Sequence, residues 1–164
     1  MLWERRHNFK AIYDKDKNTF NLKRTTIKLY NDNESNYIIT SDNSKLSNNN
    51  KLIELNGNVS VKTIIQQGDK LTANSFTWNI QNSEYLLIGN VKFEYSLVTL
   101  SSNKAILKKS TNIIEFFNPV KYKFKDNMSD SGYEINSENA YYNIYNKSVN
   151  FKSKEERVRS KIYF

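Results

Sequence analysis

Residues 71–91 read LTANSFTWNIQNSEYLLIGNV, and a similar arrangement returns several times along the chain. The stretch opens with an aliphatic, a polar, a small and a polar residue, and it reaches Gly89 eighteen residues after its start. Between these points, residues 81–83 form a polar segment whose side chains can hydrogen-bond their own backbone in a turn. The stretch therefore predicts a hairpin, and Gly89 in mid-strand predicts a bulge or sharp bend.

The opening pattern occurs four times at nearly constant spacing. It begins at Ile39, Leu71, Leu100 and Ile135, so the starts lie 32, 29 and 35 residues apart. Eighteen residues after the first three starts the chain reaches Gly57, Gly89 and Asn118. A fixed period indicates one supersecondary unit stacked on itself, and terminal copies of such a stack are expected to be irregular. A degenerate first copy is found between Ala11 and Leu22, and the last copy ends near Ser153.

Within each copy apolar and polar residues alternate, which is the side-chain period of a β-strand. The apolar sets are Ile53, Leu55, Val59, Val61 and Thr63, then Tyr85, Leu87, Val91, Phe93 and Tyr95, then Ile114, Phe116, Val120, Tyr122 and Phe124. Lys62, Lys92 and Lys121 fall on the other face, as in an antiparallel sheet with one wet side. The sequence thus predicts an all-β fold of two opposed antiparallel sheets built from about five bent-hairpin repeats.

Composition argues for one domain over residues 1–164 and against catalysis. The chain has no Cys and a single His, His7, so disulfide frameworks, zinc sites and histidine acid–base chemistry have almost no residues to use. His7 with Glu4 and Asp14 lacks the spacing of a metal site. Glu155 and Glu156 point to opposite faces of a strand, so a paired-carboxylate site is not indicated. We therefore expect no enzyme, no metal and no cofactor.

The charge leaves two interpretations open. A net charge of +8 suggests a partner that carries phosphates, such as nucleic acid, an anionic membrane or lipid A, but AT-rich codons alone could enrich the chain in lysine. The basic segments 121–125 and 152–161 can meet such phosphates, although a solvated outer face is the stronger interpretation. A nucleic-acid-binding sheet would present aromatic residues outward beside lysine, whereas here they share a face with Val, Ile and Leu.

Two motifs carry a resemblance to a known family. Residues 73–78 (ANSFTW) followed by residues 86–91 (LLIGNV), and the related residues 54–59 (ELNGNV), resemble the LptC family of lipopolysaccharide export proteins and its OstA/LptA-like relatives. The resemblance covers about Phe9 to Phe164, and residues 131–159 look like the closing repeat of LptC in particular. The third copy departs from the family pattern, because Asn118 and Pro119 stand where Gly and Asn are expected.

The resemblance implies an open, twisted β-jellyroll that carries lipid and performs no reaction. Its partners would be lipid A, an LptB-LptF-LptG type ABC transporter and an LptA-like bridge protein, with no nucleic acid. It implies a periplasmic protein that is anchored to the inner membrane by an N-terminal helix absent from this chain. Residues 1–8 would be a juxtamembrane or vector-derived segment. No apolar run here approaches the ~20 residues of a membrane helix, and residues 1–6 lack the apolar stretch of a signal peptide. The alternatives are a soluble LptA-like bridge subunit, a basic nucleic-acid-binding sheet, or a passive scaffold.

The resemblance also assigns site residues. Alternation alone favours a closed sandwich core over a ligand slot, and the resemblance reverses that preference. The predicted interior slot for acyl chains comprises Leu55, Val59, Val61, Phe76, Trp78, Leu87, Val91, Phe93, Phe116, Val120 and Tyr122. Trp78 and Tyr142 occupy equivalent repeat positions and, as amphipathic residues, are expected at its rim. Partner strands are expected to add to the two ends of the stack, at Phe20 and Leu22 and at Val149 and Phe151.

Overall fold

The computed structural model describes residues 12–14, 19–31, 34–47, 51–63, 69–108, 110–129 and 131–163. Side chains are described for these residues except 12–14, 29–31, 34–36 and 63. The expected N-terminal segment 1–8, with Glu4 and His7, lies outside the described residues, as does the side chain of Asp14.

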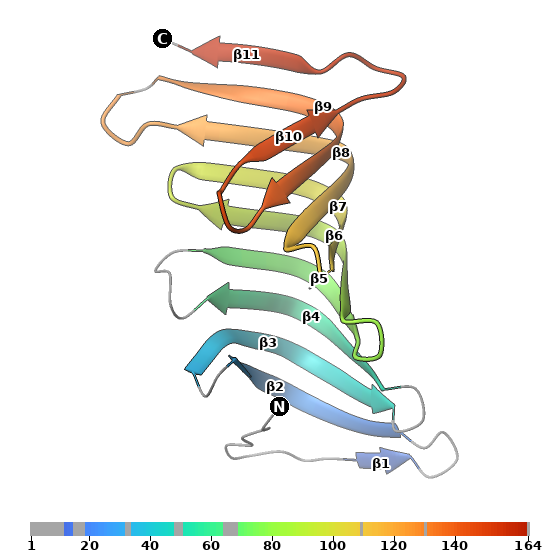
Figure 1. The fold of residues 1–164 in the computed structure, drawn as a ribbon. Helices are drawn as coiled ribbons and strands as arrows, with labels where there is room; N and C mark the ends of the chain where they lie inside the picture. The colour runs from blue at the N-terminus through green and yellow to red at the C-terminus, as the bar shows by residue number, and fades with distance from the viewer. Residues whose placement is uncertain are drawn as a thin grey trace.

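The described chain is made of strands and turns, without helix (Figure 1). The strands are β1 Ile12–Asp14, β2 Thr19–Asn31, β3 Glu34–Ser47, β4 Leu52–Thr63, β5 Lys70–Asn79, β6 Glu84–Tyr95, β7 Val98–Lys108, β8 Ile113–Lys125, β9 Gly132–Asn143, β10 Val149–Lys152 and β11 Arg159–Tyr163. They form one antiparallel sheet in the order β1 to β10, and β11 pairs with β9 beside β10. The all-β fold that the sequence predicts is therefore confirmed.

The two opposed sheets of the prediction are two layers of this single sheet, joined where the strands bend. Each of the six pairs from β3–β4 to β8–β9 loses register at one point near mid-strand, for example between Asn56 and Val59 and between Ile88 and Val91. Layer 1 contains the first halves of β3, β5, β7 and β9, the second halves of β2, β4, β6 and β8, and β11. Layer 2 contains the remaining halves, β1 and β10. We call the line of bends the corner.

Glycine occupies the corner because the backbone there is left-handed. Gly57 has φ +76° and Gly89 has φ +78°, and the Asn that follows each of them also has a positive φ. A Cβ atom on Gly89 would lie 2.7 Å from Asn74 Nδ2, and one on Gly57 would lie 2.7 Å from Asp42 Oδ2. In β8 the same place is taken by Asn118 and Pro119. The bends predicted at these three positions are confirmed.

The turns at the ends of the hairpins use the predicted side-chain chemistry. Asn79 Oδ1 accepts hydrogen bonds from the backbone N–H groups of Gln81 and Asn82 at 3.1 and 3.2 Å. Asn143 Oδ1 does the same for Tyr145 and Asn146. Residues in equivalent positions of two repeats thus make equivalent turns, as the repeat predicts.

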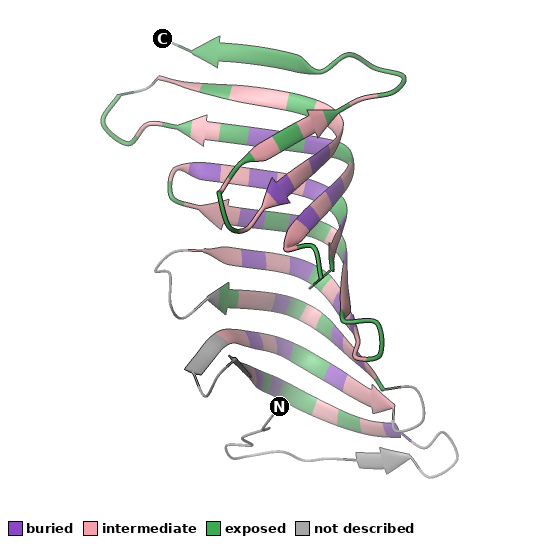
Figure 2. Cartoon of the chain, in the orientation of Figure 1, coloured by how far each residue is buried: buried purple, intermediate pink, exposed green. Residues whose placement is uncertain are grey.

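The apolar core lies between the two layers, and the polar members of the alternation lie on the outside (Figure 2). The fully buried side chains include Ile39, Leu55, Val59, Leu87, Val91, Leu100, Phe116, Val120 and Tyr142. Charged residues such as Lys92, Lys121 and Lys123 are exposed on the outer face. The one-sided burial that the alternation predicts is therefore found on every strand pair from β4 to β9.

Candidate functional site

All eleven residues of the predicted slot lie on the inner face of the folded sheet. Ten of them are buried and Val61 is half-buried. They belong to β4, β5, β6 and β8, so they form a continuous apolar surface that crosses both layers. Whether acyl chains bind to this surface stays a prediction, because the residues pack against one another in this conformation.

Aromatic rings join the two layers directly in the C-terminal half. The ring of Phe93 in layer 1 lies 4.7 Å from that of Tyr142 and 6.3 Å from that of Phe116, both in layer 2. Tyr122 in layer 1 meets Phe151 in layer 2 edge-on at 5.5 Å. These contacts bring the layers together as in a closed sandwich.

The expectation that Trp78 and Tyr142 line a wet rim is wrong. Trp78 is 2% and Tyr142 1% exposed, and both belong to the core. The physical reason is the closeness of the layers: Tyr142 lies under Tyr95 of the opposite layer, at a ring distance of 5.0 Å. Ile53 and Ile114, which the alternation placed on the apolar face, are buried as predicted, but the sequence prediction omitted the core residues Ile39, Leu100, Ala105 and Ala140. Their alternation with polar neighbours is visible in the sequence and would have found them.

An ion pair spans the side of the sandwich opposite the corner, which we call the lip. Lys147 Nζ, in the turn between β9 and β10, lies 2.9 Å from Asp69 Oδ2, immediately before β5. The two partners come from different layers and are 78 residues apart in sequence. The ammonium group also lies 5.9 Å from the ring centre of Tyr142. Burial, reinforced by the negative charge of Asp69, raises the pKa of Tyr142 above its ordinary value, so its hydroxyl stays protonated.

Small and acidic side chains stabilise the corner in successive repeats. The hydroxyl groups of Ser41, Ser102 and Ser137 each donate to the backbone carbonyl two residues further along, at 2.9–3.1 Å. In the first two copies the fourth residue of the pattern bonds across the bend: Asn58 Nδ2 donates to Asp42 Oδ2 at 2.8 Å, and Asn90 Nδ2 donates to Asn74 Oδ1 at 3.4 Å. The repeated sequence thus encodes a repeated corner.

The last corner has a different form, because β10 and β11 are separated by residues 153–158. Glu138 occupies the position that Asp42 and Asn74 hold in earlier repeats, and its carboxylate accepts the backbone N–H groups of Lys154, Glu155 and Glu156 at 2.7–2.9 Å. These hydrogen bonds lower the pKa of Glu138 below its ordinary value. The sequence prediction did not assign Glu138 a role, although its place in the fourth copy of the pattern pointed to one.

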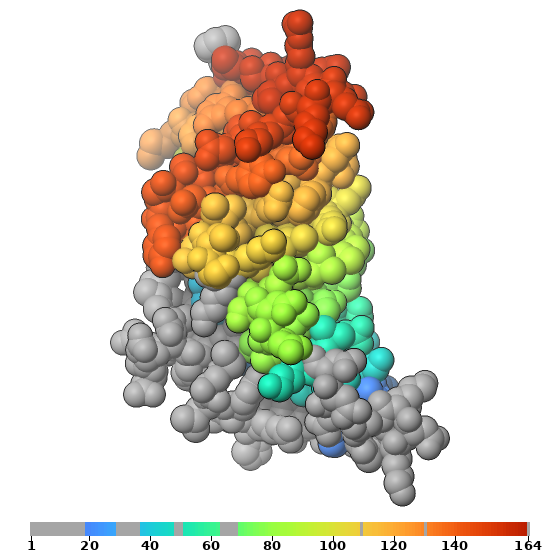
Figure 3. All heavy atoms as spheres, turned by 45° about the vertical axis from the view of Figure 1, so that its right-hand side comes forward, coloured from blue at the N-terminus to red at the C-terminus, as the bar shows by residue number. Residues whose placement is uncertain are grey.

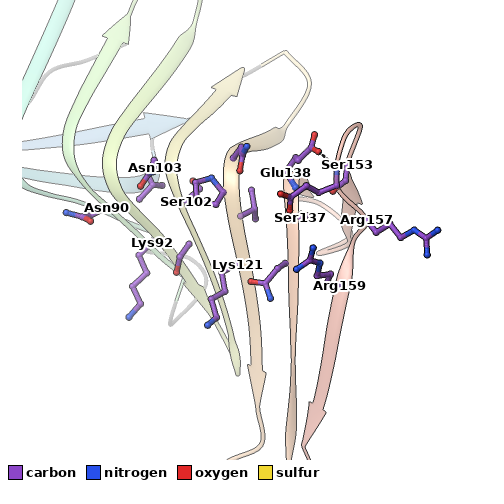
Figure 4. Close-up of a pocket in the computed structure, with 17 residues that line it drawn as sticks. Asn90, Lys92, Ser102, Asn103, Lys121, Ser137, Glu138, Ser153, Arg157 and Arg159 are labelled. Atoms are coloured by element: carbon purple, nitrogen blue, oxygen red, sulfur yellow. Dashed lines mark hydrogen bonds between the residues drawn. The ribbon is translucent and has the colours of Figure 1, made fainter.

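A groove of about 630 Å³ lies on the outer face beside this corner (Figure 4). Its basic lining residues are Lys92 of β6, Lys121 of β8, Arg159 of β11 and Arg157 from the segment between β10 and β11. The rest of the lining comprises Glu138, Glu156, Val91, Pro119, Val120 and small polar residues. Lys121 and Lys123 form ion pairs with Glu134 at 3.0 and 2.8 Å. The prediction that these lysines lie on the outer face, away from the interior, is confirmed.

The C-terminal edge of the sheet consists of β10 and β11, both paired with β9 (Figure 3, orange to red). Asn143 N donates to Ser148 O at 2.9 Å, which makes residues 143 and 148 a hydrogen-bonded pair. Because such pairs alternate along an antiparallel ladder, the N–H and C=O groups of Val149 and Phe151 point away from β9. No strand among the described residues takes up that side, so the predicted edge position of Val149 and Phe151 is confirmed.

The N-terminal edge differs in part from the prediction. Phe20 is not at an open edge, because β1 pairs with Thr19–Asn21 of β2. In this pairing Tyr13 stands opposite Phe20. These residues belong to the degenerate first copy of the repeat, between Ala11 and Leu22, whose pattern is too irregular to show that Phe20 would be paired. From Leu22 to Asn31, no described strand pairs with β2 on the side opposite β3. The edge prediction is therefore wrong for Phe20, and for Leu22 it stays a prediction.

Within the described ranges, no helix is long and apolar enough to cross a membrane. In the same ranges no three residues of the types His, Cys, Asp or Glu are grouped so as to hold a metal ion. The rings of Phe76, Phe93 and Phe116 are buried in the interior and are not available on the surface for stacking on nucleic-acid bases.

A single sheet bent at a glycine-rich corner, with apolar layers inside and strand edges at both ends, defines the class of LptA-like β-jellyrolls. Among solved structures, the chain is similar to LptH, the LptA homologous periplasmic component of the conserved lipopolysaccharide transport device from Pseudomonas aeruginosa. The two are 15% identical, the alignment covers 78% of this chain and 94% of that chain, and the TM-score is 0.58. At this identity the likeness establishes the fold.

The sequence itself matches a protein family. The model of the family described as "Lipopolysaccharide-assembly, LptC-related" matches residues 9–85, just under half of the chain. The resemblance to LptC that the repeat motifs indicate is thereby confirmed. Of the quoted stretches, residues 54–59 and 73–78 lie inside the matched residues, and residues 86–91 lie just beyond them. No curated protein matches the chain.

Proposed function

We propose that this chain is a non-enzymatic, periplasmic component of lipopolysaccharide transport, which holds lipid A acyl chains between its layers and passes them to a neighbouring β-jellyroll. The observation that carries the proposal is the match of residues 9–85 to the LptC-related family together with an unbroken apolar inner face. Within the family, the match favours an LptC-like role over that of a soluble LptA-like bridge subunit.

The inner face has the chemistry that an acyl chain requires. From β4 to β8 it presents only aliphatic, aromatic and small side chains, and such surfaces bind lipid by removing apolar area from water. The layers must separate for a chain to enter, because Phe93, Phe116 and Tyr142 now fill the space. Separation is easiest at the lip, where side chains alone connect the layers, whereas at the corner the backbone connects them.

Photo-crosslinking tests this proposal. A photoreactive residue at Phe76, Leu87 or Phe116 should capture purified lipopolysaccharide, because these side chains face the interior. The same residue at Lys62 or Lys92, exposed on the outer face of the same sheet, is the matched control and should capture little. Equal capture at inner and outer positions would mean non-specific adhesion and would contradict the proposal.

We further propose that partner strands dock on the free edge formed by β10 and β11. Substituting Val149 with proline removes an N–H group that points away from β9 and should abolish binding to an LptA-like partner with little loss of stability. Asn150→Pro removes an N–H group that points toward β9, and Val91→Pro interrupts a strand paired on both sides, so both should destabilise the fold. Partner pull-down by a folded Val149→Pro variant at the wild-type level would contradict docking at this edge.

A further inference from the structure

The two faces of β11 have different chemistry. Lys161 and Arg159 stand opposite Glu134 and Asn136 of β9 on the outer face, whereas Ile162 and Ser160 stand opposite Tyr133 and Ile135 on the inner face. Ile162 is 62% exposed, although Tyr133 beside it stacks on the core rings of Tyr122 and Phe124. The edge therefore alternates basic side chains outside with an uncovered apolar side chain inside.

The basic side chains of β11 lack acidic partners in the described part of the chain. Glu134, the nearest acid across the ladder, is already bound by Lys121 and Lys123 on its far side. Lys161 lies instead over the ring of Tyr163, with Nζ 4.9 Å from the ring centre. Arg159 has no ion-pair partner among the described residues, and Figure 4 shows it beside the groove with Lys121. The outer side of β11 thus carries two positive charges, on Arg159 and Lys161, that have no ion-pair partner among the described residues.

The opposite edge of the sheet is also basic. The open part of β2, Leu22–Asn31, contains Lys23, Arg24 and Lys28 and no acidic residue. Between Val149 and Tyr163, five basic residues and two acidic ones leave a net charge of +3, equal to that of β2.

If one copy of the chain continued the sheet of another, its Lys28 would approach Arg159 and Lys161 on the outer face of layer 1. Like charges directly opposite each other on neighbouring strands are destabilising.

From these two edges we infer the chemistry of the partner: the strand that pairs with β11 belongs to a different protein and alternates acidic with apolar residues. The acidic side chains lie opposite Arg159 and Lys161 on the outer face, and the apolar ones cover Ile162 on the inner face. This inference rests on the proposed docking at the β10–β11 edge and adds which strands that edge accepts. Charge selects the partner because the backbone hydrogen bonds of an added strand are the same for any sequence.

Two short blocked peptides test the inference with the full chain. Both carry the same alternating Ile and Val residues, and the intervening residues are all Glu in one and all Lys in the other. Fluorescence anisotropy should show the acidic peptide binding on the order of tenfold more tightly than the basic one, because two cross-strand pairs change from repulsion to attraction. The difference should shrink between about 0.05 M and about 0.5 M salt, since exposed charges are screened.

Charge reversal supplies the matched variants. The double variant Arg159→Glu, Lys161→Glu should bind the basic peptide more tightly than the acidic one. In sedimentation this variant should associate with itself through the basic β2 edge, while the wild type remains monomeric. Lys62→Glu with Lys104→Glu makes the same change at exposed positions on strands paired on both sides, and should alter neither result. Circular dichroism confirms that each variant is folded.

The possible failures are distinct. Equal binding of both peptides by the wild-type chain, or self-association of the wild type but not of the charge-reversed variant, would overturn the inference while leaving edge docking in place. Binding of neither peptide would overturn the docking proposal and the inference together.

Discussion

Replacing Gly89 with alanine should lower the free energy of unfolding by about 2 kcal/mol. With φ at +78°, an L-residue at this position costs roughly 1–2 kcal/mol relative to glycine. The new Cβ atom would lie 2.7 Å from Asn74 Nδ2 and 3.1 Å from Asn74 Cβ, so the Asn74 side chain must move. Its movement breaks the hydrogen bond from Asn90, worth roughly 0.5–1.5 kcal/mol. The lower entropy of the unfolded alanine variant offsets roughly 0.4–1 kcal/mol of the total.

Urea denaturation followed by the fluorescence of tryptophan measures this change, since Trp78 is buried one strand away on β5. For a chain of this length, a loss of about 2 kcal/mol corresponds to a fall in Tm of roughly 4–8 °C. Gly57→Ala should show the same loss, because Gly57 has nearly the same φ and the same close contact with Asp42. A variant that combines Gly89→Ala with Asn74→Ala relieves the steric contact but keeps the backbone strain, so Gly89→Ala should cost less in that background. A loss below about 0.5 kcal/mol for both single glycine variants would refute the argument that the corner requires glycine.

Three further predictions concern the lip and the last corner. Tyr142→Phe removes a buried hydroxyl group that has no hydrogen-bond partner among the described residues. Urea denaturation should therefore show an unchanged or slightly higher free energy of unfolding, and a loss above about 1 kcal/mol would contradict this. Glu138→Ala should speed hydrogen exchange at residues 154–156 alone, because the Glu138 carboxylate accepts their backbone N–H groups. Since the folded-state pKa of Glu138 is lowered, its stabilising effect is complete above about pH 4.3 and should disappear as the pH falls further. Protection of residues 154–156 that does not change with pH would refute this role. Asp69→Asn weakens the ion pair with Lys147 and should therefore raise lipopolysaccharide crosslinking to photoreactive residues on the inner face. High salt should raise the same crosslinking in the wild type, because it screens the ion pair. Unchanged crosslinking would show that the pair does not hold the lip closed.

The features predicted from the sequence are those that local patterns encode. Gly57 and Gly89 mark the corner because a left-handed bend needs a particular residue type at a particular place, and the repeat makes that place visible. The inner or outer position of a side chain such as Phe93 follows from the two-residue period of a strand.

Features that depend on how distant segments approach could not be predicted. The ion pair between Asp69 and Lys147 joins residues with no sequence relation, and it forms only because the layers close at the lip. The same closure buries Trp78 and Tyr142, because the distance between the layers is a property of the whole sheet. The pairing of β1 with Phe20 likewise depends on a short strand in the degenerate first copy, where the repeat pattern is too irregular to define the edge of the sheet.

The repeated corner has a consequence for how such a protein can change in length. Because each repeat contributes two neighbouring strands, duplicating one repeat would lengthen the sheet by roughly 9–10 Å along its hydrogen-bonding direction. The added unit would meet a similar corner on both sides, since Ser41, Ser102 and Ser137 make the same bond in three of the four copies and Ala73 takes their place in the second. Both outermost strands would keep their sequences, so the span of the molecule and the selectivity of its ends can evolve independently.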